Sequence, residues 1–156
     1  MENSRMMQVA DQLRKVVGNE NILTSRSELM VYECDGFVIE KNSPDVVVFP
    51  RNTADVAEIV KICNDADVPF LPRGAGPVWR RMLAVGGGVM IVLTRMKRIL
   101  EVNLRDRYAV VEPGVVNLWL TNHLKGTDLH YAPDPLAKAL AQLAAMSPRT
   151  RAALTR

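Results

Sequence analysis

Residues 45–76, DVVVFPRNTADVAEIVKICNDADVPFLPRGAG, decide how this chain folds. The apolar runs at 45–50 and 68–72 are each bounded by proline or glycine, which is typical of short buried strands. Between them, apolar residues recur at helical spacing after Asn52 or Thr53, either of which is a suitable N-cap. Strand, helix and strand over about thirty residues predict a βαβ unit with parallel strands.

This unit has a definite predicted core. We expect the strands at 45–49 and 68–71 to be parallel and adjacent in one sheet, with the helix packed against them. The side chains that we expect to be mostly buried are Val46, Val48, Val56, Ile59, Val60, Phe70, Val92 and either Ile91 or Leu93.

The rest of the chain shows helical periodicity near the N-terminus and short apolar runs after the unit. Three further helices are predicted, at 5–17, 25–32 and 115–124. Three further strands, separated by charged turns, are predicted at 88–93, 98–103 and 108–113. A proline-stiffened extended segment follows at 129–135, and no internal repeat is visible.

Composition describes an ordinary globular chain. Its 156 residues suffice for one domain with a core, and 48% of them are hydrophobic and 24% charged. No apolar run approaches the roughly 20 residues that span a bilayer, and the N-terminus lacks the apolar region of a signal peptide. Cys34 and Cys63 are expected to be reduced thiols, and we predict a cytoplasmic protein.

The net charge of +3 does not indicate a nucleic-acid partner. The segment 136–156 contains no acidic residue and holds the cations Lys138, Arg149, Arg151 and Arg156. Because these cations exceed the net charge, the rest of the chain is slightly acidic. We therefore expect no basic groove and no nucleic-acid binding.

Pro72-Arg73-Gly74-Ala75-Gly76 follows the second strand and is a candidate ligand-binding loop. Its glycines allow backbone N–H groups to point into a concavity that holds an anion such as a diphosphate. The alternative is a tight turn that binds nothing. The loop is not a Rossmann fingerprint, because its glycines do not open a helix, and it is not a Walker loop, because no Gly-Lys-Ser/Thr follows.

The segments 49–76, 86–120 and 129–135 (LHYAPDP) occur in one order and at one spacing, preceded by YECDG at 32–36. Together they closely resemble the N-terminal half of the FAD-linked oxidases of the vanillyl-alcohol oxidase/PCMH class. Within this class the resemblance is nearest to the catalytic D subunit of bacterial glycolate oxidase and to the related 2-hydroxyacid dehydrogenases. The resemblance covers residues 1–135.

The resemblance implies an α+β fold, the PCMH-type FAD-binding domain with a βαβ unit and a mixed sheet, truncated before completion. It divides the chain into an N-terminal helical segment (1–40), a partial FAD-binding domain (41–135) and a tail outside the family pattern (136–156). The cofactor that it implies is FAD. The implied contacts of FAD are Pro72, Arg73, Gly74, Ala75 and Gly76 for the diphosphate, and Pro113, Gly114, Pro133, Asp134 and Pro135 for the flavin cleft. By composition alone, Pro113-Gly114 is equally a plain turn and Pro133-Asp134-Pro135 a plain loop.

The function implied by the resemblance is that of an FAD-dependent oxidoreductase subunit. Its substrate would be a small 2-hydroxy acid of the glycolate or lactate type, and its partners other oxidase subunits. In the family, the substrate-binding arginine and histidines lie in a C-terminal cap domain, so we assign no catalytic residue and expect this fragment to be inactive alone. The alternative is a non-catalytic remnant of the FAD domain that serves at most as a subunit-interaction module.

The chain departs from the family pattern directly after Gly76. The family continues with a run such as T-G-L-S-G-G-A-L, whose backbone wraps the diphosphate. Residues 77–83 instead include Pro77, which lacks an N–H, and the bulky Trp79. We therefore expect weak FAD binding or none.

A change of reading frame is our hypothesis for this departure. Residues 77–80 can be written with the codons CCG-GTC-TGG-CGG, and these bases, read one base earlier after an A, spell T-G-L-A. Residues 142–154 can likewise be read one base over as I-G-G-N-V-A-E-N-A-G-G-P, the run that follows Pro-Asp-Pro in the family. If the tail is out of frame, we expect a solitary helix from about Leu136 to Met146, or no order, with few contacts to residues 45–113.

The two histidines of the chain do not suggest a metal centre. His123 and His130 have no metal-ligand spacing with each other or with the cysteines. We expect them to have surface or helix-capping roles, and we predict no metal site.

Overall fold

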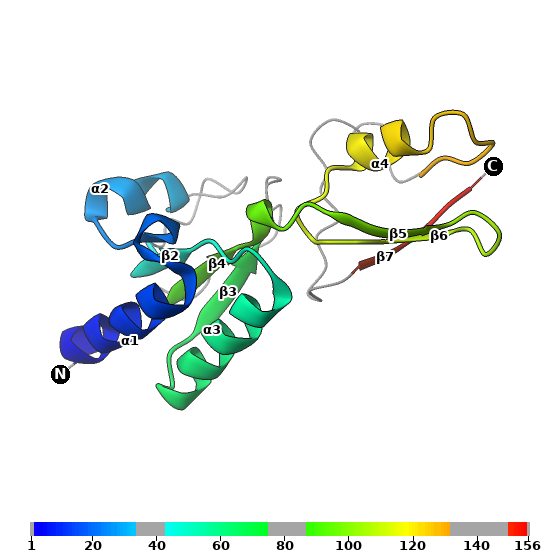
Figure 1. Cartoon of the computed structure of the whole chain (residues 1–156). Helices are drawn as coiled ribbons and strands as arrows, with labels where there is room; N and C mark the ends of the chain where they lie inside the picture. The colour runs from blue at the N-terminus through cyan, green and yellow to red at the C-terminus, as the bar shows by residue number, and fades with distance from the viewer. Residues whose placement is uncertain (1, 34–42, 75–86, 132–149, 156) are drawn as a thin grey trace. The chain divides into compact units, whose positions relative to one another are not determined.

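The computed structural model describes residues 2–33, 43–74, 87–131 and 150–155. The chain forms two compact units, one of residues 1–73 and 77–92 and the other of residues 74–76 and 93–156. Each unit contains its own sheet (Figure 1). Within the described residues, no helix has the length and apolar character needed to cross a membrane.

The first unit is built on a four-stranded sheet in the order β1-β2-β4-β3. Its strands are β1 (Ile22–Leu23), β2 (Val46–Val48), β3 (Phe70–Arg73) and β4 (Val89–Val92). The last three run parallel, and β1 pairs antiparallel with β2. Because α3 (Thr53–Asp65) connects β2 to β3, the predicted βαβ unit is confirmed.

The prediction that β2 and β3 are adjacent is wrong, because β4 lies between them. Met90 of β4 pairs with Val47 on one side and with Leu71 on the other. All four residues of β4 are buried, which suits a central parallel strand covered on both faces. β3 contains Pro72, which has no N–H for a second neighbour, and this suits an edge strand.

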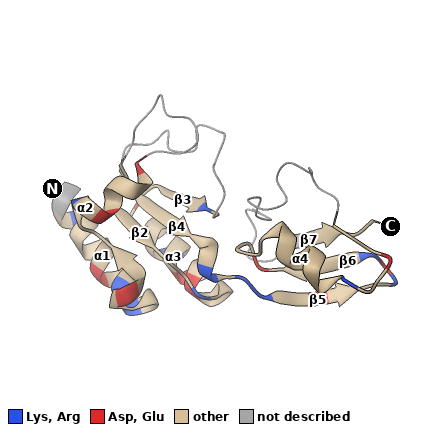
Figure 2. Ribbon diagram, turned by 90° about the horizontal axis from the view of Figure 1, so that it is seen from above, with Lys and Arg blue, Asp and Glu red and all other residues tan. Residues whose placement is uncertain are grey.

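The helices of the first unit lie where the sequence predicts them. α1 (Glu2–Val17) lies beside α3 (Figure 1), and it is followed by the 3₁₀ turn η1 (Asn19–Asn21). The predicted helix at 25–32 is present as α2 (Arg26–Leu29) and the 3₁₀ turn η2 (Met30–Tyr32). The N-cap of α3 is Asn52, whose side chain accepts a hydrogen bond from the backbone N–H of Asp55 at 2.9 Å. Acidic and basic residues are mixed along α1 and α3 (Figure 2).

Most of the predicted core is confirmed. The buried members are Val46, Val48, Ile59, Ile91, Val92 and Leu93. Val56 and Val60 are half-buried. Phe70 was predicted to be buried and is 37% exposed, because it begins the edge strand β3, where one side lacks a neighbouring strand.

The second unit contains an antiparallel sheet in the order β5-β6-β7, preceded by the 3₁₀ turn η3 (Leu93–Arg95). Its strands are β5 (Ile99–Asn103), β6 (Tyr108–Val111) and β7 (Thr150–Ala153). α4 (Asn117–His123) follows β6 and places Leu120 in a cluster with Ala109, Val111 and Val115. The predicted strands at 98–103 and 108–113 and the helix at 115–124 are therefore confirmed.

The expectation that the tail makes few contacts with residues 45–113 is wrong. β7 pairs with β6, with Arg151 opposite Val110, and both Ala152 and Leu154 are buried in the core of the second unit. One physical reason is the alternation along β7, which places the apolar residues 152 and 154 on the same face. The other is that the backbone N–H and C=O groups of β7 pair with the edge of β6, which would otherwise be unpaired. The helix predicted from Leu136 to Met146 lies outside the described residues.

Candidate functional site

The end of β3 carries the first part of the candidate loop. Pro72 is opposite Ile91 and Arg73 is opposite Val92, so Arg73 is the last paired residue of the strand. Gly74 follows it directly. In sheets with parallel strands, ligands bind at the carboxyl ends of the strands, which is where this segment lies. Ala75 and Gly76 lie outside the described residues.

The Arg73 side chain lies on an aromatic surface. Its guanidinium carbon is 5.3 Å from the ring centroid of Tyr32, a geometry suited to a cation–π interaction. The Tyr32 ring meets Phe49 edge-on, with 6.3 Å between the ring centroids. Among the described residues Arg73 has no carboxylate partner. Its positive charge is therefore available to an anion.

The second candidate segment, Pro113-Gly114, is a buried turn. The Gly114 N–H donates to the carbonyl oxygen of Met96 at 2.6 Å, and the Val115 N–H donates to the carbonyl oxygen of Glu112 at 3.1 Å. A Cβ atom on Gly114 would lie only 2.5 Å from the Met96 carbonyl oxygen. The fold of this chain therefore needs glycine here, whether or not a flavin ring also approaches.

Glu112, which sequence reasoning did not single out, anchors this turn. Its carboxylate is only 3% exposed and accepts hydrogen bonds from the backbone N–H, Nε and Nη2 of Arg98, at 2.8, 3.0 and 2.7 Å. Hydrogen bonding to Glu112 and then its negative charge raise the pKa of the largely exposed Arg98. A single acidic residue at the end of the apolar run YAVVEP is the sequence signal that could have revealed the pair.

Asn117 provides a buried polar atom whose hydrogen-bonding capacity is unused. The residue is 5% exposed, and within the described part of the chain its Oδ1 atom has no hydrogen-bond partner. An acceptor left unpaired in this way destabilises a fold by about 1–3 kcal/mol. A donor from a bound molecule would remove this penalty, so Asn117 fits a site that is completed by a ligand.

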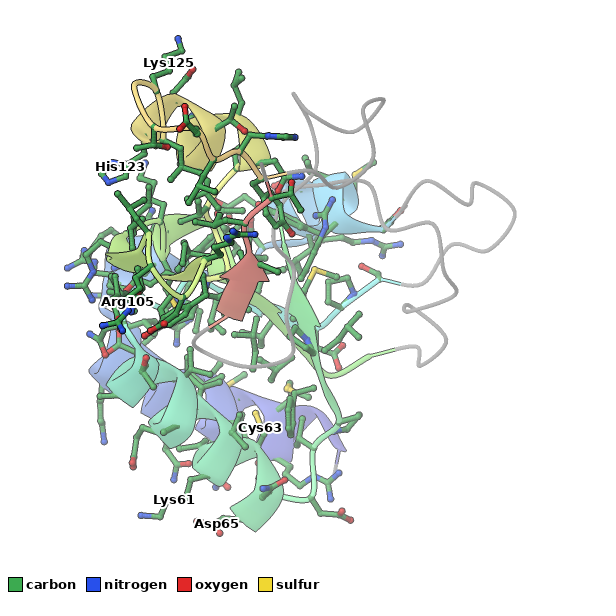
Figure 3. All side chains as sticks on the ribbon, turned by 90° about the vertical axis from the view of Figure 1, so that its right-hand side faces the viewer. Lys61, Cys63, Asp65, Arg105, His123 and Lys125 are labelled. Carbon is green, nitrogen blue, oxygen red and sulfur yellow. The ribbon has the colours of Figure 1, made fainter. Side chains whose placement is uncertain are left out.

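The remaining titratable candidates do not form a reactive centre within the described residues. His123 and His130 are exposed, and no group of three or more His, Cys, Asp or Glu side chains in the described ranges could hold a metal ion. Cys63 points into the interior, whereas Lys61 and Asp65 of the same helix point outward (Figure 3).

Burial raises the pKa of the Cys63 thiol to about 11, so it is protonated and unreactive at neutral pH. Cys34 and the segment Pro133-Asp134-Pro135 lie outside the described residues. Within the first unit, the described residues leave the guanidinium of Arg73 available to an anion. Within the second unit, they form a rigid turn at Gly114.

The family model and the curated relatives that match this chain agree with one another. A family model described as an FAD binding domain matches residues 44–147. The glycolate oxidase subunit GlcD of Escherichia coli K12 is 38% identical over 124 residues, which cover 79% of this chain and 25% of that protein. The probable mitochondrial D-lactate dehydrogenase of Danio rerio is 33% identical over 132 residues, covering 84% and 27%. The chain thus spans about a quarter of the length of these curated relatives.

Solved structures show the same fold. The 4-ethylphenol oxidase of Gulosibacter chungangensis, in complex with isoeugenol, matches with a TM-score of 0.73 and 26% identity, over 88% of this chain and 28% of that one. p-Cresol methylhydroxylase with bound substrate matches with a TM-score of 0.72 and 22% identity, over 87% and 28%. The predicted α+β fold of the PCMH type is therefore confirmed.

Proposed function

Because the chain belongs to the FAD binding domain family, we propose that it is part of an FAD-dependent oxidoreductase that oxidises a small 2-hydroxy acid. FAD is the cofactor of this family. The relatives support this substrate class, because they are named as a glycolate oxidase subunit and a probable D-lactate dehydrogenase. The structural observation that carries the proposal is the Arg73–Gly74 segment at the carboxyl end of a parallel strand.

We assign a role to each of the candidate site residues that the structure describes. The guanidinium of Arg73 binds the doubly negative diphosphate together with the backbone N–H groups that follow it. The Glu112–Arg98 pair keeps the Pro113-Gly114 turn rigid, and Asn117 offers an acceptor to a bound group. When bound, the isoalloxazine supplies the acceptor for the hydride of the 2-hydroxy acid.

We expect the chain by itself to bind FAD weakly or not at all and to turn over no 2-hydroxy acid. Pro77 removes an N–H donor from the run that would follow Gly76, and the next residues are bulky. Each lost charge-assisted hydrogen bond weakens binding by about 1.5–3 kcal/mol, so two or three losses correspond to about three orders of magnitude. No catalytic residue is assigned within the chain.

A second function, a non-catalytic module that contacts other oxidase subunits, is favoured by the same departure at residues 77–83. The GlcD relatives are themselves named as subunits, so other oxidase subunits are the proposed partners. The cytoplasmic location and the reading-frame hypothesis remain predictions. The nucleotide sequence around the codons of 77–83 and 142–154 tests the latter, and an unbroken frame with unrelated codons would reject it.

Flavin spectroscopy of the purified chain tests the expected weak binding, and a variant in which T-G-L-S-G-G-A-L replaces residues 77–83 tests the proposed FAD site. FAD is titrated while its fluorescence is followed, and turnover of glycolate and D-lactate is assayed with an artificial electron acceptor. We expect a dissociation constant above the micromolar range and no turnover. Sub-micromolar binding would show that residues 77–83 do not damage the site, and turnover would show that the chain is a complete enzyme.

A further inference from the structure

The alternation of side chains along β3 determines on which face of the sheet the Arg73 side chain lies. Leu71 and Arg73 are two residues apart and therefore point the same way. Leu71 packs against the cluster of Leu29, Val47, Met90 and Val92, whereas Val46 and Val48 point to the opposite face. The side chain of Arg73 thus emerges on the face that is covered by α2 and η2.

Tyr32 is fixed on this same face by two contacts. Its ring packs against the same cluster and meets Phe49 edge-on, at an interplanar angle of 69°. Leu29, one helical turn earlier, is 6% exposed and anchors α2 to the sheet. The ring that lies under the Arg73 guanidinium is therefore held in place before any ligand arrives.

We propose that Tyr32 is a positioning residue that holds the Arg73 guanidinium at the carboxyl end of β3, ready for the diphosphate of the cofactor. This inference rests on the proposed function and extends it to a residue of the N-terminal helical segment. An arginine on a flexible stem loses rotamer freedom when it binds an anion, and a ring that orients it beforehand reduces that loss. A guanidinium that lies over a ring still has N–H donors that do not face the ring, and these can bind an anion.

The contact between Arg73 and Tyr32 predicts how substitutions at these two positions change the affinity for an anion. Cation–π contacts of this kind correspond to about a twofold to thirtyfold change in binding. Tyr32→Leu should weaken anion binding by a factor in this range, and Tyr32→Phe, which keeps the ring face, should retain affinity within about twofold. In an Arg73→Gln background, Tyr32→Leu should cause no further loss, because the group that the ring orients is gone.

NMR spectroscopy of the ¹⁵N-labelled 156-residue chain provides the test, because it detects weak binding. The Nε–Hε signal of Arg73, assigned with Arg73→Lys, is followed in the free protein and during titration with FAD and with inorganic pyrophosphate. We expect a ring-current shift of this signal that Tyr32→Leu abolishes and Tyr32→Phe preserves. Tyr32→Met replaces Tyr32→Leu if the leucine variant fails to give the folded amide spectrum.

The outcomes separate this inference from the proposed function. Pyrophosphate binding that depends on Tyr32 only when Arg73 is present supports the inference, even if FAD does not bind the unaltered chain. No FAD binding by a variant in which T-G-L-S-G-G-A-L replaces residues 77–83 would count against the flavin function alone. An unshifted Arg73 signal, equal losses for Tyr32→Leu in both backgrounds, or no response to either probe overturns the inference.

Discussion

At the end of β3, Arg73 lies on one aromatic ring and meets no carboxylate among the described residues. At the end of β6, by contrast, the Pro113-Gly114 turn is buried, and Glu112 beside it accepts three hydrogen bonds from Arg98. We call these segments the β3 end (72–74) and the β6 turn (112–114). We propose that the charge of Arg73 at the β3 end is left for a ligand, whereas the charge of Glu112 at the β6 turn pairs with Arg98 within the fold. Substitutions at the β6 turn should therefore change stability, and substitutions at the β3 end should change binding.

The largest effect is expected for Gly114→Ala at the β6 turn. The added Cβ would lie 2.5 Å from the Met96 carbonyl oxygen and 2.6 Å from the Leu93 carbonyl oxygen, so the two backbone segments must separate. We expect the free energy of unfolding in urea to fall by about 3 kcal/mol or more. The control is Gly126→Ala, where a Cβ meets nothing within 4 Å but φ is +91°, and about 1 kcal/mol is expected. Equal losses at both positions would show that the β6 turn is not tightly packed.

Leu154→Ala tests whether the tail is part of the unit that holds the β6 turn. Leu154 is 4% exposed in the cluster with Val111 and Val115, so its truncation should lower the free energy of unfolding by about 2–3 kcal/mol. Leu104→Ala is the control, because Leu104 is 49% exposed, and it should change stability by less than about 0.5 kcal/mol. If Leu154→Ala behaves like this control, the pairing of β7 with β6 is not formed in solution.

Glu112→Gln tests whether the negative charge of Glu112 stabilises the β6 turn. The amide keeps the shape of the carboxylate but loses charge-assisted hydrogen bonds in a buried position, and we expect a loss of about 2 kcal/mol in urea unfolding. Glu101→Gln removes an exposed carboxylate that accepts a hydrogen bond from Tyr108, and it should cost less than about 0.5 kcal/mol. A loss at Glu112 no larger than that at Glu101 would contradict the structural role of the pair.

The smallest effect on stability is expected at the β3 end. Arg73→Gln should leave the free energy of unfolding within about 0.5 kcal/mol of the unaltered chain, since no described carboxylate depends on the guanidinium. The same change should weaken pyrophosphate binding by about tenfold or more, measured by NMR titration. Arg105→Gln, at an exposed position (Figure 3), should alter neither quantity. A large loss of stability in Arg73→Gln would show that the β3 end is structural like the β6 turn.

Local sequence signals predicted the parts of this fold that depend on local chemistry. Asn52 is a good N-cap wherever its helix packs, and the apolar spacing of α3 follows from its single buried face. Strand order is different, because it depends on pairing between strands that are distant in sequence. β4 lies between β2 and β3, although it comes last of the three parallel strands along the chain.

The candidate site likewise contains residues that a local motif identified and residues that only the fold brings together. Arg73 and Gly74 were identified from a local motif and lie at a strand end, as expected. The groups that hold the two segments, Tyr32 under Arg73 and Arg98 under Glu112, are distant in sequence from the residues that they support. Neither pair produces a spacing pattern, so only the folded chain brings them together.

The central claim is that this chain carries the β3 end of an FAD site whose continuation is interrupted at residues 77–83. The FAD dissociation constant of the unaltered chain, compared with that of a variant in which T-G-L-S-G-G-A-L replaces residues 77–83, tests it most directly. We predict weak or undetectable binding by the unaltered chain and binding by the variant that is tighter by about three orders of magnitude. Sub-micromolar binding by the unaltered chain, or no gain in the variant, would contradict the account.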